Sequence, residues 1–379
     1  MGREIRSSLS FLQLNLFIFL LVLSPSSSLT PKPRPPPPPL GHGPPAPALF
    51  IFGDSFFDVG NNNYIDTTTL DQANFWPYGE TFFHYPTGRF SDGRLVPDFI
   101  AEKARLPFIP PFLQPGASHH AGVNFASAGA GALVETFRGS VIDLKSQMRG
   151  FGKVESQLVQ RLGKSKARSK LSKAVYMFCI GSNDYMSPFL TNSTHLFASY
   201  SKRAYVGMVV GNLTTVVKEI YEKGGRRFGF INLPPLGCLP GLRLIGAWNN
   251  GSCFEEPSWL ADLHNTALLT RLDVLKDQLR GFRYSLYDFN AFLRHRIDHP
   301  SKYGFAEARG GCCGTGMYQG VFSCGGRRTV KEYQLCEDPS RHLFWDSYHL
   351  TERAYQQLAE ELWSGKGNKS NLKDLFQGF

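Results

Sequence analysis

The stretch ALFIFGDS, residues 48–55, joins a short apolar run to a polar turn. Five consecutive apolar residues predict a strand that is covered on both faces, and the Gly-Asp-Ser that follows predicts the turn that ends it. Comparable runs occur at 123–126, 174–180, 228–231 and 284–287. Because strands covered on both faces are typical of parallel sheets with helices on each side, these runs predict an α/β fold.

Segments with helical spacing of apolar residues alternate with these strands. They predict helices over residues 96–104, 142–162, 205–221, 259–279 and 351–363. This alternation predicts a three-layer α/β/α sandwich around a central parallel sheet. The chain has 379 residues without an internal repeat or a linker in its middle, so we expect residues 48–379 to form a single domain. A content of 42% hydrophobic residues excludes disorder throughout.

Polar or glycine-rich turns follow three of the predicted strands, at Ser55, at Gly129 and at residues 181–184. The carboxyl ends of parallel strands share one edge of the sheet, and ligands bind there where the strand order reverses. Ser55 at this edge has the position of a nucleophile. Asp346 and His349, three residues apart near the other end of the chain, are the residue types that activate such a serine.

Acyl transfer also requires hydrogen-bond donors at the position where negative charge develops. The N–H groups of Ser55 and Gly129 and the side-chain amide of Asn183 are suitable donors for such an oxyanion hole. Each motif alone has a simpler interpretation: a serine after Gly-Asp is usually a turn residue, and Asp-x-x-His before Thr351 usually belongs to a helix start. Their chain order and their positions after strands favour a catalytic site.

Four stretches, at residues 50–64, 122–131, 180–185 and 344–352, resemble in that order the first, second, third and fifth sequence blocks of plant GDSL-type esterase/lipases, members of the SGNH hydrolase superfamily. The resemblance covers nearly everything after residue 47, and the long first block looks closest to a secreted, defence-associated plant subgroup. It implies a flavodoxin-like α/β/α fold with no metal and no organic cofactor. It implies that Ser55 is the nucleophile and that Asp346 and His349 are its partners. The implied oxyanion-hole donors are Ser55, Gly129 and Asn183.

Three positions depart from the family pattern. Phe56 stands where Leu is usual, Leu350 where Pro is usual, and Ala128 where Gly is frequent. Only Ala128 bears on the geometry of the site, because left-handed backbone angles cost more for alanine than for glycine. Arg89 and Arg94 lie in a stretch that also looks family-like, and we interpret them as formers of structural ion pairs.

The amino terminus has the pattern of a secretory signal peptide over residues 1–28. Arg3 and Arg6 precede an apolar run at 11–23 that is shorter than a membrane span, and small residues follow it. Residues 29–47 form a proline-rich leader typical of a polyproline II spacer, with cell-wall binding as the alternative. We therefore expect a secreted protein of the extracellular space (apoplast), with no transmembrane segment after signal removal; an uncleaved anchor is the alternative.

In a secreted chain the cysteines are disulfide candidates. Cys179 lies inside an apolar strand and is interpreted as a buried free thiol. The other six are sufficient for three bridges; Cys238 with Cys253 would close one loop, and the remaining pairing stays open, with a metal site as the weaker alternative. These candidates are Cys238, Cys253, Cys312, Cys313, Cys324 and Cys336. Four sequons make the chain a candidate glycoprotein: Asn192, Asn212, Asn250 and Asn368.

The expected function is that of a secreted serine esterase/lipase that hydrolyses carboxylic esters through an acyl-enzyme, in lipid breakdown or defence. The alternatives are a polysaccharide O-acetylesterase and a catalytically silent extracellular binding protein on the same fold. Expected partners are an ester or lipid substrate and the cell wall.

The net charge of +10 would also suit nucleic acid, but the chain has no zinc-finger spacing or RNA-binding aromatic motif, so nucleic acid is not expected. The basic run at 164–173 is expected to be a solvated loop, with a membrane or pectin contact as the alternative.

Overall fold

A computed structural model of the chain describes residues 47–67, 71–193, 199–246, 251–365 and 371–377. The chain divides into two units, residues 1–43 and 44–379, and all of the described residues lie in the second. The predicted signal peptide, nearly all of the proline-rich leader and the sequons at Asn250 and Asn368 lie outside the described residues.

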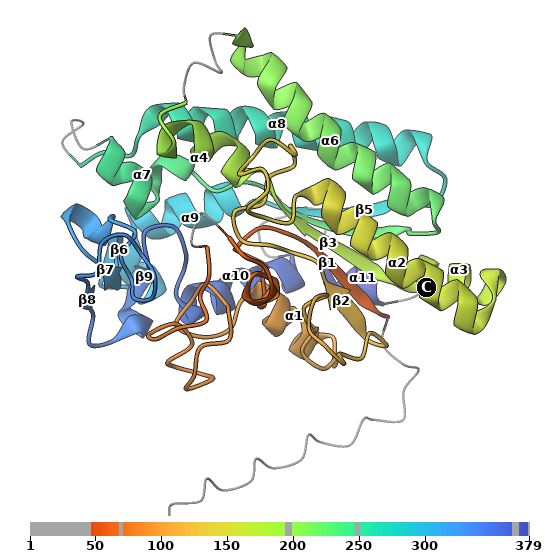
Figure 1. Cartoon of the computed structure of the whole chain (residues 1–379). Helices are drawn as coiled ribbons and strands as arrows, with labels where there is room; N and C mark the ends of the chain where they lie inside the picture. The colour runs from red at the N-terminus through yellow and green to blue at the C-terminus, as the bar shows by residue number, and fades with distance from the viewer. Residues whose placement is uncertain (1–46, 68–70, 194–198, 247–250, 366–370, 378–379) are drawn as a thin grey trace, which may run out of the picture. The chain divides into compact units, whose positions relative to one another are not determined.

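Five parallel strands form the central sheet in the order β2-β1-β3-β4-β5 (Figure 1). They are β1 (Leu49–Gly53), β2 (Gly122–Asn124), β3 (Val175–Cys179), β4 (Arg227–Ile231) and β5 (Arg283–Tyr287). The chain passes from β1 to β2 on one side and then crosses back to β3 on the other side of β1. The strand order therefore reverses next to β1, which places the switch point of the sheet at the end of the ALFIFGDS stretch.

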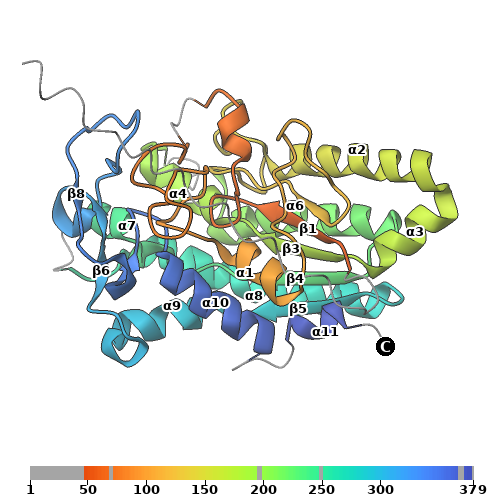
Figure 2. The same ribbon diagram turned by 90° about the horizontal axis from the view of Figure 1, so that it is seen from below.

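Helices cover both faces of the sheet (Figures 1 and 2). On one face lie α2 (Leu144–Leu162), α6 (Lys202–Glu222) and α8 (Glu255–Gln278); on the other lie α1 (Val96–Lys103), α10 (Glu352–Ser364) and α11 (Lys373–Phe376). The three-layer α/β/α arrangement predicted from the sequence is thereby confirmed.

Shorter elements lie around both ends of the sheet. The helices are α3 (Lys164–Lys173), α4 (Ser182–Leu190), α7 (Pro240–Ile245) and α9 (Phe289–Asp298), with 3₁₀ turns at Asn61–Tyr64, Leu236–Cys238, Pro300–Tyr303, Met317–Gln319 and Pro339–Arg341. Two small sheets pair β6 (Glu307–Gly311) with β9 (His342–Phe344) in parallel and β7 (Cys313–Gly314) with β8 (Gln334–Leu335) antiparallel.

Aromatic side chains fill the centre of the sheet. Phe52 of β1 stacks on Phe178 of β3 with ring centroids 4.9 Å apart, and Phe178 stacks on Phe230 of β4 at 5.4 Å. All three rings are fully buried. Aromatic residues suit a pleated, two-sided surface, so the same residues that predict strands also hold neighbouring strands together.

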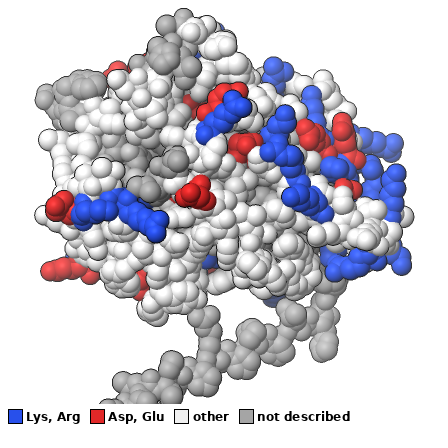
Figure 3. Space-filling model, viewed as in Figure 1, with Lys and Arg blue, Asp and Glu red and all other residues white. Residues whose placement is uncertain are grey.

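The basic run at 164–173 forms the helix α3, so the prediction of a loop there was wrong. Its Lys, Arg, Ala and Leu residues favour helix, and Ala167 and Leu171, four positions apart, are buried on one side of it. Lysine and arginine side chains gather over the α2–α3 region, at the right of Figure 3. No helix in the described part of the chain has the length and hydropathy to cross a membrane.

Candidate active site

Ser55 is the second residue after β1, where the chain turns away from the sheet. A Cβ atom on Gly53 would lie 2.5 Å from the carbonyl oxygen of Cys179 in β3, so only glycine permits this close approach. The turn is closed by Asp54, whose carboxylate accepts the N–H of Phe56 at 3.1 Å. Ser55 is 9% exposed, at the edge between the core and solvent.

Two segments that are distant in sequence meet at this turn. The Nε2 atom of His349 lies 2.8 Å from the Oγ of Ser55, and its Nδ1 lies 2.8 and 2.9 Å from the two carboxylate oxygens of Asp346. Asp346 and His349 stand in the loop between β9 and α10, and Thr351 caps α10 with its side chain. The fold therefore joins Ser55, His349 and Asp346 in one continuous line of hydrogen bonds.

The Asp346 carboxylate is fully buried, yet its surroundings favour the ionised form. Burial alone would raise the pKa of Asp346, but the adjacent His349 ring, the N–H of Tyr348 and the hydroxyl of Tyr78 together hold that pKa below its usual value. A permanently ionised acceptor at Nδ1 keeps the ring proton on that nitrogen. The lone pair of Nε2 is then directed at the hydroxyl of Ser55, as a general base requires.

Gly129 stands in the loop after β2 and Asn183 in the first turn of α4, after β3, so the two flank β1 from both sides. Gly129 has φ +79°, and a Cβ atom there would lie 2.7 Å from Oδ2 of Asp71 and 2.8 Å from Cγ1 of Val141. Glycine is therefore required at this position. Ala128 is not among the residues with positive φ, so alanine costs no strain there.

Asn183 is held by the loop that carries Gly129. Its Nδ2 donates one hydrogen bond to the carbonyl oxygen of Ala130 at 3.0 Å. A side-chain amide carries two N–H hydrogens. No second acceptor for this amide is present in the part of the chain that the structure describes, so one N–H remains for a ligand.

A buried polar network that sequence reasoning missed supports the loop after β2. Asp58 accepts the N–H groups of Gly60, Asn61 and Ala128 at 2.6–3.0 Å. The amide of Asn61 donates to the carbonyl oxygens of residues 124 and 126, and that of Asn62 donates to residue 128. Three consecutive asparagines after a glycine were a visible signal of backbone capping, since Asn pairs readily with main-chain groups.

Asp184 holds the same loop from the other side and was also missed. Its carboxylate accepts the N–H groups of Ala132 and Leu133 and the hydroxyl of Thr136 at 2.7–3.0 Å. Burial raises the pKa of Asp184 to about 6. Asn183 and Asp184 thus act as a pair, in which one side chain faces the site and the next ties down the backbone beside it.

Substitution of Asn183 by alanine tests its place in the oxyanion hole. We expect kcat to fall by ~10²–10³-fold, the usual cost of losing one oxyanion donor, with little change in KM. The measurement is steady-state hydrolysis of p-nitrophenyl butyrate, with Ser187→Ala in the same helix as the control for the stability of α4. An Asn183→Ala enzyme with wild-type kcat would exclude Asn183 as a donor.

Asp54 makes the stability of the fold depend on pH. Burial, with a smaller contribution from Asp184, raises the pKa of Asp54 from 3.8 to about 8, and its Oδ2 atom has no hydrogen-bond partner among the described residues. Above pH 3.8 the folded chain keeps a proton that the unfolded chain has released. The free energy of unfolding therefore falls as the pH rises toward 8, by ~1.4 kcal/mol per pH unit for this one group.

The Asp54→Asn variant keeps a side-chain oxygen that accepts the N–H of Phe56, but it has no titratable group at this position. We expect the melting temperature of this variant, relative to wild type, to rise steadily from pH 5 to pH 8. Both proteins share the other titrating carboxyls, so their contributions cancel in the difference. Calorimetry at four or five pH values is the measurement, and parallel curves would show that Asp54 is already ionised in the fold.

The cysteines form three disulfides, Cys238–Cys253, Cys312–Cys336 and Cys313–Cys324, while Cys179 is a buried free thiol. The sulfur atoms of Cys312 and Cys336 lie near His342, but a disulfide leaves no thiolate to bind a metal.

Of the sequons within the described residues, Asn192 and Asn212 are both exposed.

Arg89 and Arg94 both form ion pairs. Arg89 binds Asp98 at 2.7 Å, and Arg94 binds Glu352 at 2.7 Å and Glu102 at 3.1 Å. These contacts agree with the structural interpretation of both arginines. The pair with Glu352 joins the segment of Arg94 to the start of α10, directly after the loop of His349.

Comparison with known proteins identifies the family. The profile described as GDSL-like Lipase/Acylhydrolase matches residues 49–362. GDSL esterase/lipase 5 of Arabidopsis thaliana is 56% identical over 340 residues, which cover 87% of each chain, and GDSL esterase/lipase 1 of the same plant is 52% identical over 337 residues, 87% of this chain and 90% of the relative. A more distant relative, Inactive GDSL esterase/lipase-like protein 25 of Arabidopsis thaliana, is 35% identical over 336 residues, 87% of this chain and 75% of the relative. The chain has an α/β/α sandwich, with a serine, a histidine and an aspartate connected by hydrogen bonds at the switch point of its sheet. It belongs to the plant GDSL esterase/lipases, a family of carboxylic ester hydrolases.

Proposed function

We propose that this protein is a secreted serine esterase/lipase that hydrolyses carboxylic esters through an acyl-enzyme at Ser55. One observation carries the proposal: Nδ1 of His349 donates to Asp346 and the Oγ of Ser55 donates to Nε2 of His349, each hydrogen bond 2.8 Å long. A serine hydroxyl is a weak nucleophile, and a base within hydrogen-bond distance is what activates it.

In the first half of the reaction, Nε2 of His349 takes the hydroxyl proton while the Oγ of Ser55 attacks the ester carbonyl carbon. The N–H groups of Ser55 and Gly129 and the amide of Asn183 stabilise the resulting oxyanion. Collapse of the tetrahedral intermediate breaks the bond to the alcohol oxygen, which receives the proton from His349. The alcohol leaves, and the acyl group remains bound to Ser55.

Water completes the cycle. His349 takes a proton from a water molecule as its oxygen attacks the acyl carbon, and the same donors stabilise the second oxyanion. Cleavage of the bond to Oγ releases the acid, and the proton returns to Ser55. Asp346 stays ionised throughout and stabilises the imidazolium that forms in each half.

Secretion is part of the proposal. Three disulfides within residues 238–336 are typical of a protein that folds in an oxidising compartment. Residues 1–28 have the pattern of a signal peptide, and two exposed sequons are available for glycosylation. The proposed setting is the apoplast, in contact with the cell wall, where ester cleavage would serve lipid breakdown or defence.

The experiment that tests the substrate class is a series of p-nitrophenyl esters of increasing acyl length. The full chain is produced in a eukaryotic secretory host, with Ser55→Ala as control. Ser55-dependent turnover that increases with chain length supports a lipase. Turnover of the acetate alone supports an O-acetylesterase and overturns the lipase reading.

A covalent probe tests the catalytically silent alternative separately. A fluorophosphonate reacts only with a serine whose hydroxyl is activated by a base, so we expect it to label wild type and not Ser55→Ala. Absence of labelling and of turnover on every ester would favour a binding protein on this fold.

A further inference from the structure

Tyr78 reaches the Asp346 carboxylate from a segment 268 residues away in the chain. Its hydroxyl donates to Oδ2 of Asp346 at 2.7 Å. The phenol ring is fully buried and packs edge-on against Phe90 and Trp345. Burial, reinforced by Asp346, raises the pKa of Tyr78 well above its ordinary value, so the hydroxyl keeps its proton and remains a donor.

The other oxygen of the carboxylate is already occupied. Oδ1 of Asp346 accepts the backbone N–H groups of Tyr348 and His349, both at 2.9 Å, in addition to the ring N–H of His349. Apart from that shared ring N–H, Tyr78 supplies the one hydrogen bond to Oδ2 among the described residues. The hydroxyl of Tyr78 therefore determines whether the carboxylate plane stays aligned with the imidazole.

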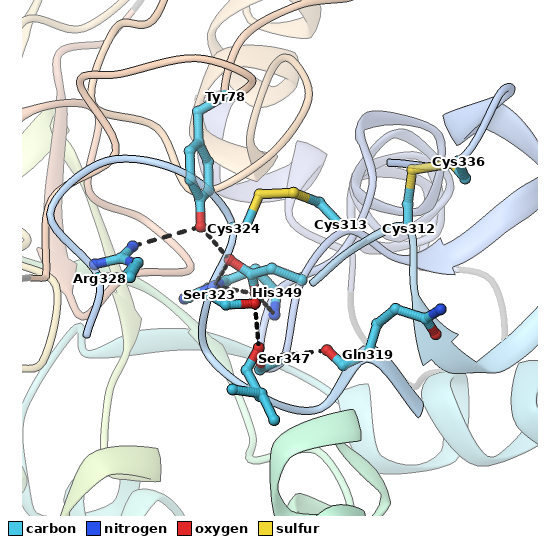
Figure 4. The surroundings of a disulfide bond; sticks show 12 residues. Tyr78, Cys312, Cys313, Gln319, Ser323, Cys324, Arg328, Cys336, Ser347 and His349 are labelled. Carbon is cyan, nitrogen blue, oxygen red and sulfur yellow. Dashed lines mark hydrogen bonds and ion pairs between the residues drawn. A yellow bond between two sulfur atoms is a disulfide. The ribbon is translucent and has the colours of Figure 1, made fainter. Parts of the chain in front are cut away.

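Arg328 is a second polar neighbour of that hydroxyl. Its Nη2 donates to the carbonyl oxygen of Gln72 at 3.0 Å and to the phenol oxygen of Tyr78 at 3.5 Å, and its guanidinium lies 3.7 Å from the centre of the Phe322 ring. A guanidinium has donors and no acceptor. The phenol oxygen can only accept from Arg328, so its own hydrogen has to point at Asp346. Figure 4 shows Tyr78 between Arg328 and the loop of His349.

The Cys313–Cys324 disulfide fixes the segment that carries Arg328 (Figure 4). The N–H of Cys313 donates to the carbonyl oxygen of Trp345 at 2.7 Å, directly before Asp346. On the other side, a Cβ atom on Gly325 would lie 2.3 Å from the carbonyl oxygen of Trp76, in the segment of Tyr78. The segments of Arg328, Tyr78 and Asp346 are thus held together by covalent and backbone contacts.

We propose that Tyr78 and Arg328 are positioning residues of this esterase: the guanidinium orients the phenol, and the phenol holds the Asp346 carboxylate in the plane that receives the Nδ1–H of His349. The inference rests on the proposed function, because it assigns these residues to the reaction at Ser55. Neither residue touches the reacting atoms.

The same contacts predict a pH signature. The titratable and charged groups that face Asp346 are His349, the phenols of Tyr78, Tyr348 and Tyr355, and Arg328 through Tyr78. A hydrogen bond to the ionised form lowers the pKa of a carboxyl, so removal of the Tyr78 hydroxyl raises the pKa of Asp346. The protonation that inactivates the site at low pH is then expected to occur at higher pH.

The test is Tyr78→Phe, which keeps the ring packing and removes the hydroxyl. We expect kcat for p-nitrophenyl butyrate to fall by ~10–100-fold, the range for losing one hydrogen bond to a charged group, with KM within about twofold. The acidic limb of the kcat profile is expected to move to higher pH by ~0.5–1 unit. Active sites are titrated with a fluorophosphonate, so that kcat refers to folded enzyme.

Tyr355→Phe is the matched control, because it removes another fully buried phenol near Asp346 that is not hydrogen-bonded to it. The control is expected to keep the wild-type acidic limb. A Tyr78→Phe enzyme with a lower melting temperature but an unchanged limb and kcat would show a merely structural role and overturn the inference. Loss of turnover in Ser55→Ala separates this outcome from failure of the proposed function.

A double-mutant cycle tests Arg328, and Arg328→Lys by itself serves as the test if Tyr78→Phe fails to fold. Arg328→Lys keeps the charge and removes the planar donor, so we expect ~3–10-fold loss of kcat and the same direction of limb shift. In the Tyr78→Phe background, Arg328→Lys should cost nothing more, because Arg328 acts through the phenol. An equal cost in both backgrounds, or Arg328→Lys alone with a wild-type limb and kcat, would overturn its assigned role.

Discussion

Replacement of Ser55 by alanine is expected to lower kcat on p-nitrophenyl esters by ~10⁵-fold, leaving only the residual rate that binding and oxyanion donors supply. Among the described residues, the side chain of Ser55 makes one hydrogen bond, with Nε2 of His349, and it lies at the boundary between core and solvent. Its removal leaves no large cavity and no unpaired backbone group. We therefore expect the melting temperature to stay within a few degrees of wild type, so that lost activity reports lost chemistry.

Ser347→Ala is the matched control for Ser55→Ala. Ser347 is buried in the loop of His349, and its hydroxyl makes a long contact of 3.5 Å with the carbonyl oxygen of Gln319. Its loss should change kcat by less than tenfold. The double variant Ser55→Ala/His349→Ala should be no slower than Ser55→Ala, since residues that act as a unit have non-additive effects. A Ser55→Ala enzyme with wild-type turnover would refute the nucleophile assignment.

Asp346→Asn is expected to lower kcat by ~10³–10⁴-fold near pH 7, through the wrong imidazole tautomer. Two backbone N–H groups point at Oδ1 of Asp346, so the single amide oxygen of asparagine has to take that position. The amide nitrogen then replaces Oδ2 and donates to Nδ1 of His349. The imidazole proton moves to Nε2. This nitrogen then faces Ser55 as a donor and cannot accept the hydroxyl proton.

Hydrolysis kinetics of Asp346→Asn, normalised by the amount of folded protein, provide the measurement. KM should change little, because Asp346 is fully buried behind the imidazole. Asp338→Asn is the control, an exposed carboxylate four residues before β9 that bonds Ser340. Turnover above a tenth of the wild-type rate in Asp346→Asn would mean that the tautomer is set by another group.

The strands, the main helices and the three residues in line at the site follow from local sequence. The strands β1, β3 and β4 are short, mainly apolar runs that predict strands from local sequence alone, while β2 (GVN) and β5 (RYSLY) are more polar. Ser55, Gly129 and the Asn183 turn were identified because each follows a strand, and the geometry of parallel strands places such turns on one edge. Helix α3 was missed because its apolar face is only Ala167 and Leu171, too little to stand out in a basic run.

The polar side chains that support the site could not be predicted from local sequence in the same way. Asp58 and Asp184 carry out backbone capping, and a carboxylate that accepts three N–H groups looks the same in sequence as one in water. Tyr78 and Arg328 are 250 residues apart, and nothing local distinguishes them from the many other tyrosines and arginines. The disulfide partners of Cys312 and Cys313 were likewise open, because two adjacent cysteines can exchange partners without any change in local pattern.

The sequence by itself determined the α/β architecture, the family and the types of residue at the site, since hydrophobic periodicity and turn chemistry act over a few residues. The tertiary structure decided the distances that make those residues a unit: 2.8 Å from Ser55 to His349, and 2.7 Å from Tyr78 to Asp346. It also decided the pKa direction of the buried carboxyls, which depends on burial and on partners far away in the chain. Contacts of this kind form only when the sheet, the small β6–β9 pair and the disulfide loop are packed together, and no local pattern specifies that packing.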